Sequence, residues 1–168
     1  ERGTMDQIMV SPLRPAQVIM GKTLPYMAIA LVSATLILIL GYFLFAIEVK
    51  GNLLVLYAGI FMVILGALGQ GVLISTITES QQVAFLISVF SSLLPSFLLS
   101  GFVFPVASMP VFLQVLSNFA AVKFFLVIVR GVMLKGVGFE AVWPQFVYLT
   151  LFAALTLGIS VKRFQKRV

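Results

Sequence analysis

The sequence predicts an all-α integral membrane protein with four transmembrane helices. Of its 168 residues, 61% are hydrophobic and 10% are charged, and the mean hydropathy is +1.18. A water-soluble domain of this size could not bury so much apolar surface, so lipid has to cover the remainder. Several long stretches also carry no charge, and a helix that crosses a bilayer needs about 20 mostly apolar residues. A lipid bilayer is therefore expected to be a permanent partner.

Four segments are long and apolar enough to span a membrane. They cover about residues 23–47, 52–78, 82–104 and 143–161. The fourth span ends at a basic cluster, as is common where a helix reaches the headgroups. These spans make residues 23–168 a single predicted transmembrane domain, preceded by a polar loop over residues 1–22.

Two regions break the pattern of simple spans. Residues 105–140 are apolar but are interrupted by Pro105, Pro110, Gly131, Gly136 and Gly138. Within them, residues 122–134 could form a helix that is too short and too charged to span. We therefore expect an extracytoplasmic re-entrant or interfacial helical hairpin. In the third span, Pro95 removes a backbone donor and predicts a kink, and neighbouring helices would have to satisfy the freed carbonyl.

The distribution of basic residues favours an orientation with both ends of the chain in the cytoplasm. An even number of crossings places the two ends on the same side. Seven basic residues then lie inside and four outside, in agreement with the positive-inside rule. The inside set is Arg2, Arg14, Lys22, Lys162, Arg163, Lys166 and Arg167, and the outside set is Lys50, Lys123, Arg130 and Lys135.

The composition argues against an enzyme with its own catalytic site. Cysteine and histidine are absent, which removes thiolate nucleophiles, imidazole acid-base chemistry and soft metal sites. The acidic residues after the first turn, Glu48, Glu79 and Glu140, fall in predicted loops, and no Walker lysine motif is present. The net charge of +6 comes from basic residues at the ends of hydrophobic segments, where they meet headgroups, so we expect no nucleic-acid binding.

The N-terminal loop is expected to contain a short amphipathic helix. Thr4 and Gln7 have the spacing of a capping box, and Met5, Ile8 and Met9 would share one face. Prolines at positions 12 and 15 then interrupt the chain before the first span. This helix could lie in the headgroups or dock on a partner protein. Glu1 is not an initiator, so we expect a further N-terminal part.

Polar and small residues within the spans suggest two kinds of helix contact. Ala67, Gly71 and Ser75 repeat as small-xxx-small, which predicts a close approach to another helix. Gln70 lies in mid-span and needs a hydrogen-bond partner, which a neighbouring helix or a substrate path could provide. Lys123 and Arg130 are seven residues apart, so a helix would place them on one face about 10 Å apart. They could snorkel to headgroups or form a basic exit vestibule that attracts anions.

Several short motifs, taken in order and spacing, resemble ABC-2 type transporter permeases of the bacterial drug-efflux kind. The resemblance covers essentially the whole chain. It rests on Glu1-Arg2-Gly3-Thr4-Met5, Ser11-Pro12, Arg14-Pro15, Gly21-Lys22, Leu24-Pro25-Tyr26, Leu73-Ile74-Ser75-Thr76, Gln81-Gln82, Leu99-Ser100-Gly101-Phe102, Phe104-Pro105, Ser108-Met109-Pro110, Arg130-Gly131 and Lys135-Gly136.

The resemblance implies a permease that couples ATP hydrolysis in a partner nucleotide-binding subunit to efflux across a bacterial inner membrane. ATP and Mg²⁺ would be bound by that partner, with no cofactor in this chain, and two permeases would form a homodimer or heterodimer. The coupling helix that docks on the ATPase would lie in the first loop, with Glu1, Arg2, Gly3, Thr4, Met5, Gln7, Ser11, Pro12, Arg14 and Pro15. The outer gate would include Gly101, Phe102, Phe104, Pro105, Met109, Pro110, Lys123, Arg130 and Gly131.

The resemblance also implies that a first span, a large extracytoplasmic domain and a second span precede Glu1. The chain departs from the family in the hairpin, where Ala121, Lys123 and Val127 replace the usual proline, threonine and acidic residue. Arg130 thereby loses its expected counter-ion. An apolar path would suit a hydrophobic or amphipathic cargo such as a drug. The alternative hypothesis is a membrane anchor or assembly subunit that transports nothing.

Overall fold

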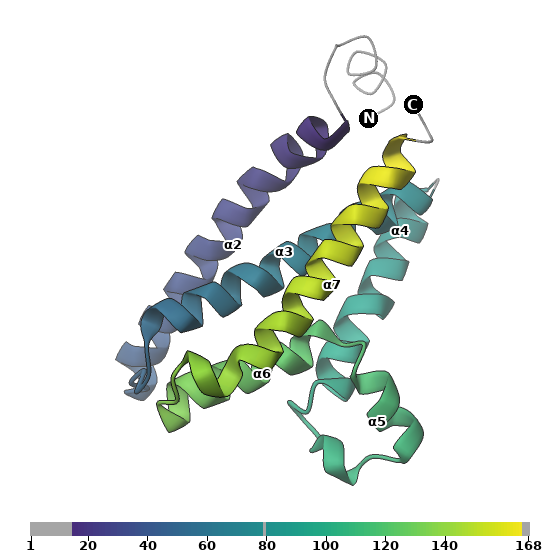
Figure 1. Cartoon of the computed structure of the whole chain (residues 1–168). Coiled ribbons are helices and arrows are strands. Elements are labelled where there is room, and N and C mark those ends of the chain that lie inside the picture. Colours follow the sequence, from purple (N-terminus) through teal and green to yellow (C-terminus); the bar gives the residue numbers. More distant parts are fainter. Residues whose placement is uncertain (1–14, 79, 166–168) are drawn as a thin grey trace.

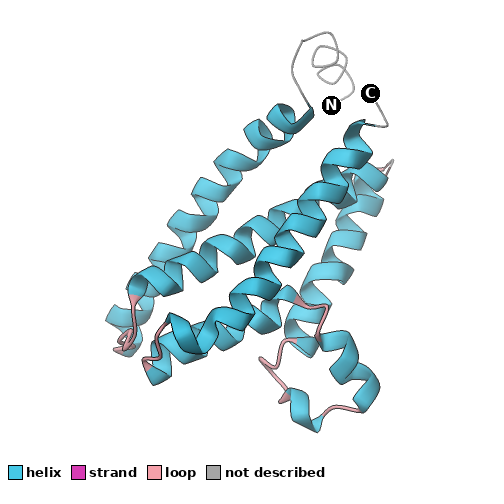
Figure 2. Cartoon of the chain, in the orientation of Figure 1, coloured by secondary structure: helices cyan, strands magenta, loops and turns pink. Residues whose placement is uncertain are grey.

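The computed structural model describes residues 15–78 and 80–165, and all regular structure in these two ranges is helical (Figure 2). Four helical segments are long and apolar enough to cross a membrane, namely Ile19–Phe45, Leu53–Ile77, Gln81–Leu99 and Phe139–Arg163. The prediction of an all-α membrane fold with four spans is confirmed. The predicted coupling helix and most of its residues lie in 1–14, outside the described part of the chain.

Three of the spans are single helices, and the third is built from consecutive pieces. The elements in order are α2 (Pro15–Phe45), α3 (Leu53–Ile77), α4 (Gln81–Ser88), η1 (Val89–Leu93), η2 (Pro95–Leu99), η3 (Val106–Ser108), α5 (Val111–Ser117), α6 (Ala121–Arg130), η4 (Gly131–Lys135) and α7 (Phe139–Gln165). The segments η1, η2 and η4 are π-helical, and η3 is a short 3₁₀ turn.

The long helices begin and end where the local sequence favours it. Asn52 caps α3, since its side-chain oxygen accepts a hydrogen bond from the backbone N–H of Leu54 at 2.8 Å. Directly after α2, Ala46 has a φ of +51°, which stops the helix. The third span ends at Leu99, before the upper limit that the sequence predicted, because Gly101 follows with a φ of +81°.

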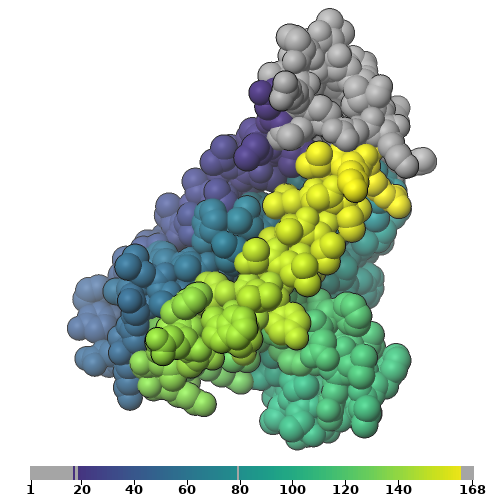
Figure 3. Space-filling view, in the orientation of Figure 1, coloured from purple at the N-terminus to yellow at the C-terminus, as the bar shows by residue number. Residues whose placement is uncertain are grey.

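The first turn of α2 and the last turn of α7 lie at the same end of the bundle (Figure 1). The loop between α2 and α3, the start of α7 and the segment α5 lie at the other end. Both ends of the described chain therefore face one side, as an even number of crossings requires. In Figure 3 the residues around α5 form a bulge that extends beyond the long helices.

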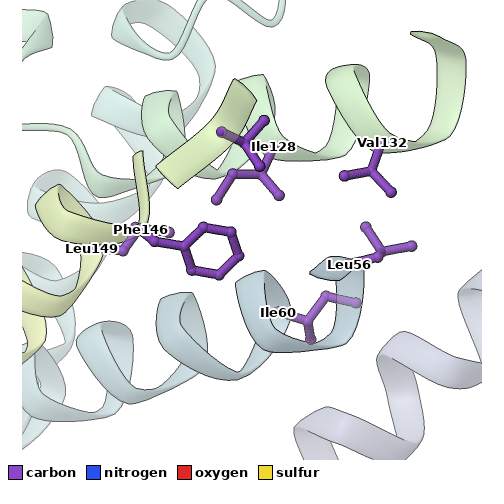
Figure 4. Close-up of a cluster of buried hydrophobic side chains, with 7 residues drawn as sticks. Leu56, Ile60, Ile128, Val132, Phe146 and Leu149 are labelled. Atoms are coloured by element: carbon purple, nitrogen blue, oxygen red, sulfur yellow. The ribbon is translucent and has the colours of Figure 1, made fainter. Parts of the chain in front are cut away.

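The core lies where α3, α6, η4 and α7 meet (Figure 4). Its buried side chains are Leu56, Ile60, Ile128, Val132, Val142, Phe146 and Leu149. By contrast, α2 is largely unburied within the chain, with Ile19 as its one buried hydrophobic residue among those described, and it touches mainly α3 and α7. The outer helix therefore presents most of its apolar surface to whatever surrounds the chain in the membrane.

Glycines on α3 bring its backbone close to α7. A Cβ atom at Gly69 would lie 2.5 Å from the Oγ1 of Thr156, and one at Gly66 would lie 2.8 Å from the ring of Phe152. The Oγ of Ser160 also donates to the carbonyl of Gly69 at 3.2 Å. Small residues allow such an approach in membranes, where backbone proximity supports van der Waals packing and polar contacts.

The small residues predicted to make this approach lie on a different face of α3. Ala67, Gly71 and Ser75 are exposed, and a Cβ at Gly71 would meet nothing within 4 Å. Their predicted role in packing is wrong for contacts within the described ranges, because α7 lies against the face that carries Gly66 and Gly69. Packing of the stripe formed by these three small residues against a second chain remains a prediction.

The region predicted as a re-entrant or interfacial hairpin, residues 105–140, contains several short helices. Here α5 is followed, after a break of three residues, by the continuous helix of α6 and η4, and the two parts are bent by 82°. Pro110 immediately precedes α5, and Gly136, with a φ of +66°, ends η4. The prolines and glycines that argued against a straight fifth span thus flank the short helices.

Candidate functional site

The break in the third span is connected to α3 through one side chain. In an unbroken α-helix, the carbonyl of Ser91 would accept a hydrogen bond from residue 95, and Pro95 has no N–H. The Nε2 of Gln70 donates to this carbonyl at 3.3 Å and to the Oγ of Ser91 at 3.1 Å. A neighbouring helix therefore supplies a donor where the proline removed one, as the sequence predicted. The span itself continues through Pro95 as π-helical turns, and a kink there remains a prediction.

Serines accompany the π-helical segments on either side of Pro95. The hydroxyl of Ser96 donates to the carbonyl of Ser92, and the hydroxyl of Ser100 donates to the carbonyl of Ser96. Such bonds back to the preceding turn often accompany bent helices, and π-helical turns are frequent at functional sites. Sequence reasoning had singled out the proline but not the serines, although their four-residue spacing was a visible signal.

A cavity of about 380 Å³ lies beside this break and is lined by α3, the third span, α7, Leu116 and residues 119–122. We call it the polar cavity, since four of its lining side chains are Gln70, Ser91, Ser92 and Ser96. Its other walls are apolar and include Ala67 of α3. The volume is in the range of small-molecule sites, and a few polar groups in an apolar wall can orient a ligand.

A second cavity of about 430 Å³ flanks the same span, and we call it the apolar cavity. It lies between the third span and the segment from Phe104 to Leu113. Pro95 and Leu99 line both cavities, so this segment of the span separates them. Four of the residues predicted for the outer gate contribute to it or border it, namely Phe104, Pro105, Met109 and Pro110, and Phe102 is exposed nearby in sequence.

Lys123 is held within the hairpin by neutral oxygens. Its Nζ donates to the Oγ of Ser117 at 2.9 Å and to the Oδ1 of Asn118 at 2.7 Å. Ser117 ends α5 and is fully buried, so the ammonium group ties α6 to the C-terminal end of α5. Headgroup contact and a basic vestibule, the two interpretations left open by the sequence, both remain predictions.

Arg130 connects the hairpin to the end of the third span. Its Nη2 donates to the carbonyl of Gly101 at 3.1 Å. The sequence had placed both residues in one predicted gate, and the structure brings them into contact. Gly131, the next residue, is buried against Val137 and Val142. Arg130 lacks the carboxylate partner that the family resemblance implies, and a backbone oxygen accepts its hydrogen bond instead.

The hairpin is also bonded to the loop between α2 and α3. The backbone N–H of Gly51 donates to the carbonyl of Val132 at 2.9 Å, and that of Lys50 donates to the carbonyl of Met133 at 3.3 Å. A Cβ at Gly51 would lie 2.7 Å from the Val132 oxygen, so this contact requires glycine. Sequence reasoning did not foresee this connection, because backbone pairing between loops leaves no side-chain pattern.

The remaining predicted site residues are placed as follows. Pro15 is the first residue of α2, and the other residues assigned to coupling precede it, outside the described ranges. Among residues 15–78 and 80–165, no group of three or more His, Cys, Asp or Glu side chains could hold a metal ion. The features brought together are therefore a span with π-helical turns, two cavities and a hairpin tied to its neighbours.

The sequence was compared with known protein families. A family model described as ABC-2 type transporter matches residues 1–134. The chain belongs to the ABC-2 type transporter family. In this family member the match includes α2, α3, the third span and the hairpin, up to the end of η4. The sequence-based assignment is thereby confirmed.

The relatives of this ABC-2 chain include proteins named as transport permeases. It is 36% identical over 168 residues to the probable multidrug ABC transporter permease YbhR of Escherichia coli, covering 100% of this chain and 45% of the relative. It is 28% identical over 169 residues to the inner membrane transport permease YhhJ, with the same coverage. It is 26% identical over 165 residues to ABC transporter G family member 23 of Dictyostelium discoideum, covering 95% of this chain and 23% of the relative. The chain thus spans less than half the length of these relatives, and no solved structure matches it.

Proposed function

We propose that this chain is the transmembrane part of a permease subunit in an ATP-driven ABC exporter. Membership of the ABC-2 type family and similarity to a protein named a probable multidrug ABC transporter permease support this proposal. The chain carries no catalytic site of its own in this proposal. A partner nucleotide-binding subunit binds ATP and Mg²⁺, and the permease exports a hydrophobic or amphipathic substrate such as a drug.

The observation that carries the proposal is the polar cavity at the break in the third span. A polar group within a bilayer is unfavourable unless it is hydrogen-bonded, and a broken helix loses backbone bonds. Gln70, Ser91 and Pro95 combine both features next to a cavity of about 380 Å³. A passive anchor or assembly subunit, the competing function, has no use for such a cavity.

The proposal also includes an arrangement of the chain in the membrane. The chain lies in a bacterial inner membrane with both ends in the cytoplasm, and two permeases, identical or related, pack together. Residues 1–15 dock on the ATPase, and motion passes through α2 to the outer end of the bundle. There the hairpin, tied to Gly101 by Arg130 and to residues 50 and 51 by backbone bonds, acts as the outer gate.

The test is co-purification of the full-length permease with candidate ATPase subunits, followed by substrate-stimulated ATP hydrolysis. One variant combines Asp6→Lys and Ile8→Pro, which reverses a charge and breaks the predicted coupling helix. It should retain membrane insertion and lose stimulated hydrolysis. The matched control is Lys162→Glu, a charge reversal in the last turn of α7. This control should couple normally.

If no ATPase associates with the wild-type permease, the exporter function is wrong and the anchor function takes its place. If an ATPase associates but the variant in residues 6 and 8 couples as well as the wild type, the assignment of the coupling helix is wrong. Stimulated hydrolysis that falls equally in the Lys162→Glu control would also contradict that assignment.

A further inference from the structure

The polar cavity has hydrogen-bonding capacity that the protein itself does not use. Ser92 is an exposed residue at the cavity, and its hydroxyl makes no hydrogen bond to another residue in the described ranges. The amide of Gln70 uses its Nε2 for Ser91, and its Oε1 has no partner among the same residues. One hydroxyl and one amide oxygen are thus available to a ligand, and both are neutral.

Neither cavity offers a charge to a ligand. No Asp, Glu, Lys or Arg appears among the residues that line the polar cavity or the apolar cavity. The walls come from stretches of sequence without acidic residues, since residues 49–78, 80–139 and 141–168 contain no Asp or Glu. Glu48 and Glu140 are exposed at the ends of these stretches. A cationic ligand would therefore enter without a counter-charge.

Lys123, the basic residue nearest to the cavity lining in sequence, makes a cationic ligand still less favourable. Residues 119–122 line the polar cavity, and Lys123 follows them directly. Its ammonium group bonds only to neutral oxygens, those of Ser117 and Asn118, so its charge is not cancelled by these contacts. In surroundings of low dielectric, an uncancelled positive charge repels a cation more strongly than it would in water.

We propose that the polar cavity binds uncharged amphiphiles and discriminates against lipophilic cations. The ligand's hydroxyl or amide group bonds to Ser92 and Gln70, and its apolar body lies against the apolar walls around Pro95 and Leu99, which both cavities share. An anion also finds no cation in the lining itself, because the Lys123 ammonium lies outside the lining and already donates to Ser117 and Asn118. This inference deepens the proposed function and rests on it for the transport step, while binding can be measured without an ATPase.

The test uses three tritiated phenylalkyl probes that share one chain and end in a hydroxyl, a trimethylammonium or a carboxylate group. Binding to the full-length permease in nanodiscs is measured without ATPase, after subtraction of the signal from empty nanodiscs. We expect the hydroxyl probe to bind at least about tenfold more tightly than either charged probe, since an ion would leave water without a partner. Binding of either charged probe as tight as that of the hydroxyl probe would overturn the inference.

Two substitutions locate the site. Ser92→Asp places a carboxylate in the cavity wall, so the preference for the hydroxyl over the trimethylammonium probe should shrink or reverse. Ser33→Asp, the same change on an exposed face of α2, should leave the preference unchanged. Ser92→Ala removes a hydroxyl that makes no bond within the described ranges, so the fold should persist while the hydroxyl probe binds several-fold more weakly.

The outcomes separate this inference from the proposed function. If Ser92→Ala binds the hydroxyl probe as the wild type does, the ligand lies elsewhere and the site assignment is wrong. If a partner ATPase is stimulated by the trimethylammonium probe in preference to the hydroxyl probe, the exporter function stands and the substrate class is wrong. If the hydroxyl probe is preferred but no ATPase associates, the binding site stands and the exporter function is wrong.

Discussion

Replacing Gln70 by leucine tests whether one amide repairs the break in the third span. The Nε2 of Gln70 donates to the carbonyl of Ser91, which Pro95 deprives of its helical donor, and to the Oγ of the same serine. Leucine has a similar size, so the main loss is two hydrogen bonds. Hydrogen bonds between side chains of membrane helices contribute about 0.6 kcal/mol on average and up to about 1.7 kcal/mol. We therefore expect Gln70→Leu to reduce the free energy of unfolding by about 1–3 kcal/mol.

A double-mutant cycle with Pro95→Ala separates this role from general packing. Alanine restores an N–H at position 95 that can donate to the carbonyl of Ser91. In that background the Gln70→Leu change removes only the bond to the Ser91 hydroxyl, so its effect should fall to about half. The coupling between the two positions would then be positive and specific to the shared carbonyl.

The measurement is reversible unfolding of the full-length permease in a bilayer mimetic, with the free energy of unfolding determined for the four members of the cycle. Thr150→Val serves as the control, because the Thr150 hydroxyl lies near the Phe146 carbonyl at 2.8 Å and the Met62 sulfur at 3.7 Å and shares no partner with Pro95. Its effect should add to that of Pro95→Ala. Additive behaviour of Gln70→Leu and Pro95→Ala, within about 0.5 kcal/mol, would refute the proposed repair.

Two further predictions concern the ties of the hairpin. Gly51→Ala should lower the free energy of unfolding by about 1–3 kcal/mol, because its Cβ would lie 2.7 Å from the oxygen of Val132. Gly71→Ala, where nothing lies within 4 Å, should change it by less than about 1 kcal/mol or raise it, and equal losses at both glycines would contradict the contact. Arg130→Gln removes the donor to Gly101, so amide hydrogen exchange should accelerate in the segment after Gly101 and stay unchanged in α7. Uniform acceleration throughout the chain would instead indicate global destabilisation.

The sequence was sufficient to predict the spans and the need for repair at Pro95. Hydrophobic runs of the required length are local properties, and a missing N–H follows from the proline itself. Gln70 was also predicted to need a partner. The sequence could not predict that Gln70 would supply the donor that Pro95 lacks. This pairing depends on how α3 is rotated and shifted against the third span.

The same limit explains the error in the small-residue stripe. The spacing of Ala67, Gly71 and Ser75 indicates a smooth helix face, but spacing alone does not say which neighbour covers it. Gly66 and Gly69 lie on the face that meets α7, where Thr156 and the chain around it approach closely. Likewise, the partners of Lys123 lie at the C-terminal end of α5 and in the turn after it, whose position depends on the 82° bend.

The connection between residues 50 and 51 and the carbonyls of residues 132 and 133 has a consequence for evolution. Both bonds use main-chain atoms, so side chains at most of these positions can be exchanged without breaking the tie. Position 51 is constrained, since a Cβ there would strike the oxygen of Val132, and position 132 is constrained by its place in the core. Diverging members of this family can therefore alter the surface around the loop, where a new ligand or neighbour would exert selection, while the hairpin keeps its attachment to the rest of the bundle.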